Sequence, residues 1–195
     1  MKSFQDRLFK DFDVEKVPEK NGKIRNRYVY VGDYAAWCLN EEEKIRYKRL
    51  YAGCGILIIV LYIWKSLMPL PVNSARFAGA STLLSLAALM PLIGGLWKFI
   101  FARKEMYLRD AREARSWILW GSMLYLILQI AGVIAGIVFS VMHGAGFWEA
   151  VVILAGAVSA FLAFVLYAAQ LRLRYLEIPN PGKKKDGENG LEAAP

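Results

Sequence analysis

The chain has 195 residues, a hydrophobic fraction of 56% and a formal net charge of +8. Its length fits one domain, and its hydrophobic fraction exceeds the roughly 45–50% usual for soluble proteins, which excludes an ordinary soluble composition. The basic residues collect on one side of four apolar stretches, so the net charge reflects membrane topology and anionic lipid. Nucleic acid is not an expected partner.

The first twelve residues predict a short amphipathic helix. Phe4, Leu8 and Phe12 recur at helical spacing among basic residues. Such a helix fits the headgroup region of a membrane, and it fits equally well against the protein's own cytoplasmic segment. Both alternatives stay open.

A β-hairpin is predicted next. Asn21-Gly22 is a turn dipeptide, and residues 23–31 are rich in aromatic and β-branched side chains, with residues 14–17 as the partner strand. Residues 1–40 therefore form a small cytoplasmic subdomain.

The first membrane-spanning helix is predicted to begin below the membrane. Asn40 suits the N-cap, and the acidic residues 41–43 suit the first turn, where the helix dipole favours negative charge. The apolar span covers about residues 50–68. Lys65 lies so near its end that we expect the ammonium to reach the headgroups while the stem stays in lipid.

Three further stretches predict spans at about residues 77–100, 117–142 and 149–171. Each holds the roughly 20 residues that cross a hydrocarbon core. The outer connections are short, whereas the cytoplasmic linker, residues 103–115, is longer and charged. The spans therefore form two helical hairpins.

The predicted fold class is an all-α membrane protein. Residues 41–171 form a bundle of four transmembrane helices, and residues 172–195 form a cytoplasmic tail. We expect the tail to be disordered from about residue 179, because it has almost no apolar side chains to bury.

The distribution of basic residues predicts the orientation. Of the 25 Lys and Arg residues, 22 lie before the first span, between the second and third, or after the fourth, and Lys98 lies just inside the end of the second span, which makes 23 on one side. Only Lys65 and Arg76 lie near the other face. The positive-inside rule therefore places both termini in the cytoplasm, and a multi-pass protein of the cell or plasma membrane is expected.

Two short patterns resemble motifs of the type II CAAX prenyl endopeptidases. Glu41-Glu42 with Arg46 fits one motif, and Phe139 with His143 fits the other. The predicted topology puts the two patterns on opposite sides of a hydrocarbon core of about 30 Å. Those enzymes also need a second histidine, and this chain has one. The resemblance is therefore rejected.

Other catalytic and metal chemistries lack their residues. The sequence contains no H-E-x-x-H and no G-x-S-x-G motif, and its two cysteines form no CxxC pair. Only Glu149 lies close in sequence to His143, too few ligands for a metal. We expect no catalytic residue, no metal and no cofactor, and therefore no enzyme.

Small and polar residues form a stripe on each of the last two spans. Two apolar helices in lipid associate through small residues and interhelical hydrogen bonds, so a helix–helix seam is favoured over a substrate groove. The predicted interface residues are Tyr125, Gln129, Gly132, Gly136, Gly156, Ala160 and Ala163.

A short outer loop makes these two spans antiparallel and predicts their register. Gly136 is expected opposite Gly156, Gly132 opposite Ala160, Gln129 near Ala163 and Tyr125 near Tyr167. At the outer face we expect Glu149 within reach of His143 or Arg76.

The sequence therefore predicts a small, non-enzymatic membrane protein that binds a protein partner or helps to assemble one. The ordered-looking segment before the first span is the expected docking surface. The alternative is an oligomeric transporter or channel subunit. The lipid bilayer and either a protein partner or further copies of the chain are the expected partners.

Overall fold

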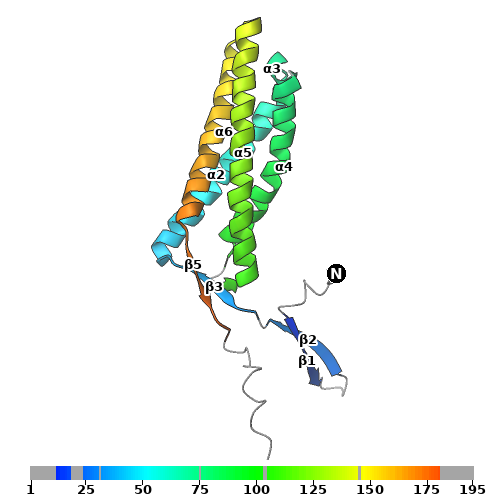
Figure 1. Cartoon of the computed structure of the whole chain (residues 1–195), viewed down its shortest axis with the longest axis vertical. Coiled ribbons are helices and arrows are strands. Elements are labelled where there is room, and N and C mark those ends of the chain that lie inside the picture. Colours follow the sequence, from blue (N-terminus) through cyan, green and yellow to red (C-terminus); the bar gives the residue numbers. More distant parts are fainter. Residues whose placement is uncertain are drawn as a thin grey trace, which may run out of the picture.

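The computed structural model describes residues 12–18, 24–30, 32–74, 76–102, 105–144 and 146–180 (Figure 1). Two members of the predicted surface helix, Phe4 and Leu8, lie outside these ranges, as do the predicted Asn21-Gly22 turn and the tail from residue 181. Phe12 is the first residue of strand β1 (Phe12–Pro18). The prediction that the helix reaches Phe12 is therefore wrong, because the backbone there pairs with another strand.

The predicted hairpin is present near the N-terminus. Strand β1 pairs antiparallel with β2 (Ile24–Tyr30), in a register that runs from Phe12 opposite Tyr30 to Pro18 opposite Ile24. Residues 14–17, the predicted partner segment, lie within β1. Aromatic and β-branched residues favour such a strand because they fit a pleated surface.

Four helices within the described residues are long and apolar enough to cross a membrane: α2 (Glu41–Leu67), α4 (Arg76–Ile100), α5 (Leu108–His143) and α6 (Phe147–Arg172). The four-residue helix α3 (Pro71–Ser74) follows α2. At the start of α2 the Asn40 amide donates to Glu43 Oε2 at 3.2 Å, as in a capping box. α5 begins nine residues before the predicted third span.

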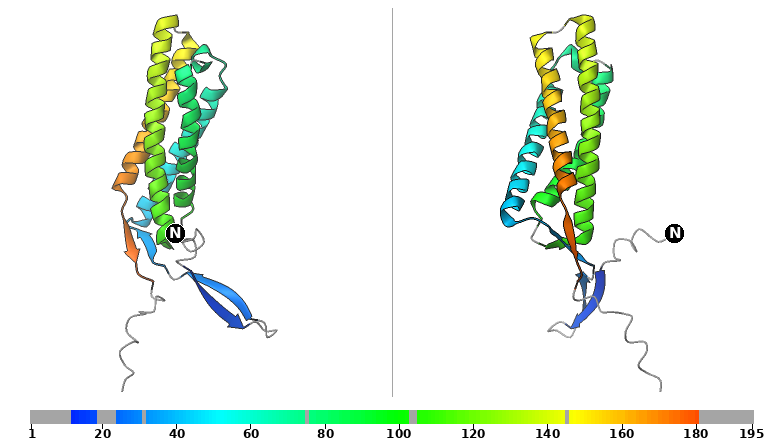
Figure 2. Two further views of the ribbon diagram at one scale, coloured as in Figure 1. Left: turned by 45° about the vertical axis from the view of Figure 1, so that its right-hand side comes forward. Right: turned by 60° about the vertical axis from the view of Figure 1, so that its left-hand side comes forward.

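The helices close into a bundle in which α4 lies along α5, α5 along α6, and α6 along α2 (Figures 1 and 2). The most extensive packing joins α4 to α5, which belong to different predicted hairpins. A Cβ placed on Gly121 would lie 2.8 Å from the backbone nitrogen of Leu92, and one on Gly95 would lie 2.9 Å from that of Ile118. The backbones of α4 and α5 therefore approach each other closely, which the stripes on the last two spans did not predict.

Apolar side chains occupy both the inside and the outside of the bundle. Tyr51, Ile58, Leu92 and Leu166 are fully buried, whereas large apolar side chains such as Phe161 remain largely exposed along the helices. Apolar surface on this scale is not left in water by a monomeric protein. The outward faces of these helices are therefore compatible with a membrane, as are their lengths.

A three-stranded antiparallel sheet lies at one end of the bundle, in the order β4 (Glu105–Tyr107), β3 (Tyr34–Trp37), β5 (Tyr175–Ile178) (Figure 1). Tyr34 lies opposite both Tyr107 and Ile178. β3 precedes the first long helix, β4 lies between the second and third, and β5 follows the fourth. These three segments meet at one end because each is separated from the next by an even number of long helices. The sequence did not predict any of these three strands.

Candidate functional site

The polar stripe of α5 and the small-residue stripe of α6 face the interior of the bundle. Tyr125, Gln129, Gly136, Gly156, Ala160 and Ala163 are buried, and Gly132 is half-buried. An amide in the middle of an apolar helix needs a hydrogen-bond partner, because an unsatisfied one is costly in a water-free interior. We therefore take Gln129 and its hydrogen-bond partner as the first candidate site.

Gln129 is paired with a lysine. The Lys65 ammonium donates to Gln129 Oε1 at 3.0 Å, and the two residues are 8% and 2% exposed. Lys65 comes from the C-terminal end of α2, whereas Gln129 lies near the middle of α5. A charged side chain therefore reaches the interior of the bundle, although no charged residue occupies the middle of a predicted span.

The expectation that Lys65 reaches the headgroups is wrong. In an α-helix each Cα–Cβ bond tilts toward the helix N-terminus. The N-terminus of α2 lies at the sheet end of the bundle, so the stem of Lys65 starts toward the sheet and away from the C-terminal end of α2. Burial against α5 and α6 then holds the side chain inside.

Glycines make room for the ammonium. A Cβ placed on Gly156 would lie 3.6 Å from Lys65 Nζ and 3.8 Å from Gln129 Oε1, and one on Gly132 would lie 4.0 Å from Nζ. An alanine Cβ there would touch both groups at van der Waals distance, so a side chain longer than alanine would crowd the pair. The small residues of the stripes thus leave space for the Lys65 ammonium and also allow the helices to pack closely.

The predicted register of α5 against α6 is wrong by about one helical turn. Gly136 faces Ile153, and Gly156 faces Val133, so the two glycines do not meet. Gly132 faces the Ser81 hydroxyl of α4, where Ala160 was expected. A stripe on one helix has several possible neighbours in a bundle, and here the lysine from α2 occupies part of the seam.

A cavity of about 20 Å³ adjoins the pair, with room for about one water-sized body. Its walls include Lys65, Asn73 and Thr82, together with the glycines at positions 132, 136 and 156. Asn73 Nδ2 donates to the backbone oxygens of Lys65 and Met68 at 2.9 and 2.8 Å. This amide therefore fixes the end of α2 that carries the lysine.

The structure describes the side chains of two of the three residues predicted to meet at the outer face, His143 and Glu149. Glu149 is buried and its Oε2 accepts the Gly146 amide at 3.1 Å, which caps α6. His143 stacks on Phe139 with ring centroids 4.3 Å apart, and its Nδ1 lies 3.1 Å from the Phe139 carbonyl oxygen. Within the described residues no ion pair joins His143 to Glu149. The side chain of Arg76 lies outside what the structure describes.

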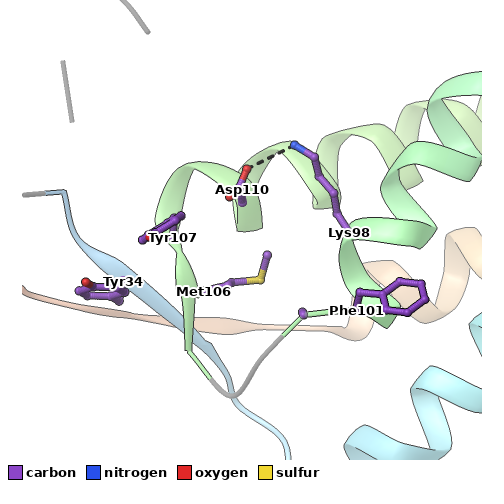
Figure 3. A pocket seen from close by; sticks show the side chains of 7 residues that line it. Tyr34, Lys98, Phe101, Met106, Tyr107 and Asp110 are labelled. Atoms are coloured by element: carbon purple, nitrogen blue, oxygen red, sulfur yellow. Dashed lines mark hydrogen bonds and ion pairs between the residues drawn. The ribbon is translucent and has the colours of Figure 1, made fainter. Parts of the chain in front are cut away.

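A second candidate site is a cleft of about 600 Å³ between the sheet and the adjoining ends of α4 and α5 (Figure 3). Four of its side chains are aromatic or thioether groups, namely Tyr34, Phe101, Met106 and Tyr107. Lys98 also lines the cleft, and its ammonium contacts Asp110 at 3.3 Å and Glu113 at 2.6 Å. Volumes of 300–1,000 Å³ are typical of binding pockets.

The wall formed by the sheet is held by contacts between distant segments. The rings of Tyr30, Tyr34 and Tyr107 lie with centroids 4.0–5.9 Å apart. Arg112 of α5 pairs with Glu177 of β5 at 2.7 Å. We call this assembly of β3, β4, β5 and the adjoining ends of α4 and α5 the inner platform, after the cytoplasmic side on which the sequence predicts that it lies.

Sequence reasoning did not select the residues of the inner platform, because its strands have only three or four residues and no alternation to recognise. The described residues contain no cluster of three His, Cys, Asp or Glu side chains suited to a metal ion. No family model, no curated protein and no solved structure matches this chain.

Proposed function

We propose that this chain is a four-span integral membrane protein that binds a protein partner at the inner platform and acts as a non-enzymatic assembly or accessory component. The observation that carries the proposal is the cleft. It places exposed aromatic side chains beside the sheet of β3, β4 and β5, whose strands come from before, between and after the long helices. Phe101 is 64% exposed and Tyr107 is 41% exposed. Aromatic residues and methionine are the types enriched at protein–protein interfaces.

The orientation belongs to the same proposal. The predicted arrangement of 23 basic residues on one side favours a cytoplasmic location for the inner platform. A partner that docks there is a cytoplasmic protein or the cytoplasmic part of another membrane protein. The opposite charges of Lys98 and Asp110 at the cleft suit a polar rim around an apolar contact.

Site-specific photocrosslinking in native membranes tests the proposal. A photoreactive phenylalanine derivative replaces Tyr107 or Phe101 in the cleft, and in a matched control it replaces Phe147, which is 75% exposed at the other end of the bundle. We expect a discrete adduct from the two cleft positions and none from position 147. Met106→Arg should weaken the adduct because it charges the apolar wall.

Absence of an adduct from both cleft positions, or equal adducts from all three positions, would contradict partner binding at the inner platform. An adduct at twice the 22.0 kDa mass of the chain would identify the partner as a second copy.

The alternative function is an oligomeric transporter or channel subunit, and the burial of Lys65 favours it. Ionisable residues inside a membrane commonly mark ion or proton paths. Against this alternative, the cavity beside Lys65 has room for about one water-sized body, which is no continuous path through one chain. Ion flux into proteoliposomes that contain the purified chain would support transport.

A further inference from the structure

The ammonium of Lys65 lies among neutral groups. It donates a hydrogen bond to the uncharged Gln129 Oε1, and Gly132 and Gly156 lie beside it. A buried charge is strongly disfavoured unless an opposite charge or a full set of hydrogen bonds compensates it. One neutral acceptor satisfies one of the three ammonium donors.

The chain offers little negative charge for this lysine. In the sequence no Asp or Glu occurs between Glu43 and Glu105, or between Glu113 and Glu177 except at Glu149. Glu149 accepts the Gly146 amide and lies seven residues from Gly156, about 10 Å along α6. Within the described residues no carboxylate forms an ion pair with Lys65.

The contrast with Lys98 shows what the Lys65 site lacks. Lys98 also projects from a long helix, and two carboxylates contact its ammonium at 3.3 and 2.6 Å. Its charge is thus compensated within the chain. Lys65 is more deeply buried than Lys98 and has no comparable partner among the described residues.

The cavity beside Lys65 has the size for a small counter-ion. Its volume of about 20 Å³ suits one small body better than phosphate, a carboxylate or another polyatomic anion. Lys65 forms one wall, and most of the remaining wall is glycine and aliphatic. A monatomic, weakly hydrated anion fits this combination of charge, size and apolar surroundings.

We propose that Lys65 and the adjoining cavity bind a single halide ion, chloride in the natural setting. The ammonium donates one hydrogen to Gln129 and directs another to the halide, whose charge neutralises the lysine inside the bundle. Close approach depends on Gly132 and Gly156, since larger side chains would fill the space. The site is distinct from the inner platform and does not depend on partner binding.

Thermal unfolding of the full chain in mild detergent tests the proposal. Sodium chloride is exchanged for sodium methanesulfonate at constant ionic strength, and bromide is tested in its place. A ligand that binds only the folded state stabilises it in proportion to the logarithm of its concentration. We expect chloride and bromide to raise Tm by roughly 2–6 °C at ten times their Kd. The dependence of Tm on halide concentration should fit binding at a single site.

Three variants locate the response. Lys65→Met removes the charge and should abolish the halide effect. Gln129→Glu should also abolish it, because the new carboxylate lies where it can pair with the ammonium at 3.0 Å. Lys98→Met is the matched control and should keep the full response, because its charge is already compensated by Asp110 and Glu113.

Equal Tm in chloride and methanesulfonate for the unmodified chain would overturn the proposal. A halide response that persists in Gln129→Glu would place the ion elsewhere and overturn it also, even if Lys65→Met fails to fold. In crystals grown with bromide, an anomalous peak next to Lys65 Nζ would confirm the site directly.

Discussion

The phenolic hydroxyl of Tyr51 on α2 donates a 2.7 Å hydrogen bond to Gln170 Oε1 on α6, and both side chains are fully buried. These residues are 119 positions apart in the chain. The bond joins the first long helix to the last near the inner platform and closes the bundle. Hydrogen bonds between helices are a principal source of specificity in apolar surroundings, where hydrophobic drive between helices is small.

Tyr51→Phe should therefore lower the free energy of unfolding by about 1 kcal/mol, because Gln170 Oε1 loses its donor. The double variant Tyr51→Phe with Gln170→Leu should regain most of this loss, since removing both partners leaves no unsatisfied group. Thermal unfolding in detergent measures both variants. Tyr47→Phe, on the same helix and half-buried, is the control and should change stability little. Equal losses from the single and double variants would contradict a specific bond.

The close approach of α4 to α5 predicts opposite effects for two glycine substitutions. Gly121→Ala should destabilise the bundle by about 1–3 kcal/mol, because the new Cβ would meet the Leu92 backbone at 2.8–2.9 Å. Gly53→Ala is the matched control, with nothing within 4 Å of the new Cβ. It should stabilise α2 by about 0.5–1 kcal/mol through helix propensity. A Gly121→Ala variant as stable as the unmodified chain would show that the helices can separate without cost.

Cysteine accessibility tests the orientation. Cys38 is exposed beside β3, and Cys54 is buried in α2. An impermeant maleimide should label Cys38 only after the membrane is opened. In a Cys38→Ser background, Gly146→Cys at the other end should be labelled in intact cells, because a Cβ there meets nothing within 4 Å. Labelling of Cys38 in intact cells, with Gly146→Cys protected, would reverse the topology.

The inner platform depends on Trp37 more than on its surface ion pair. The Trp37 ring packs edge-on to Phe99 and Tyr175, with centroids 5.0 and 5.9 Å apart, and the residue is 8% exposed. Trp37→Ala should cost about 3–5 kcal/mol and loosen the sheet.

Limited trypsin digestion with mass spectrometry measures the loosening. Cleavage after Arg174, whose carbonyl accepts the Cys38 amide at 3.1 Å, should accelerate strongly in Trp37→Ala. Arg112→Ala removes the exposed pair with Glu177 and should change the rate little, because exposed ion pairs contribute about 0–1 kcal/mol. Faster cleavage in Arg112→Ala than in Trp37→Ala would contradict this ranking.

Local signals in the sequence determined the long helices and the hairpin. Hydropathy located four apolar stretches, Asn40 and the acidic residues after it located the start of α2, and aromatic and β-branched residues located β2. Each signal acts over one helical turn or one strand, so it can be interpreted without knowing what lies nearby. Burial of Gln129 was predictable for the same reason, since a lone amide in an apolar helix must face protein.

Tertiary structure alone decided the partners of these elements. The direction of Lys65 depends on the rotation of α2 and on the position of α5, which no local pattern specifies. The register of Gly136 against Ile153 depends on side chains from other helices that enter the same seam. β3, β4 and β5 each have only three or four residues and pair across more than sixty positions of the chain, so their pairing follows from the bundle that brings them to one end.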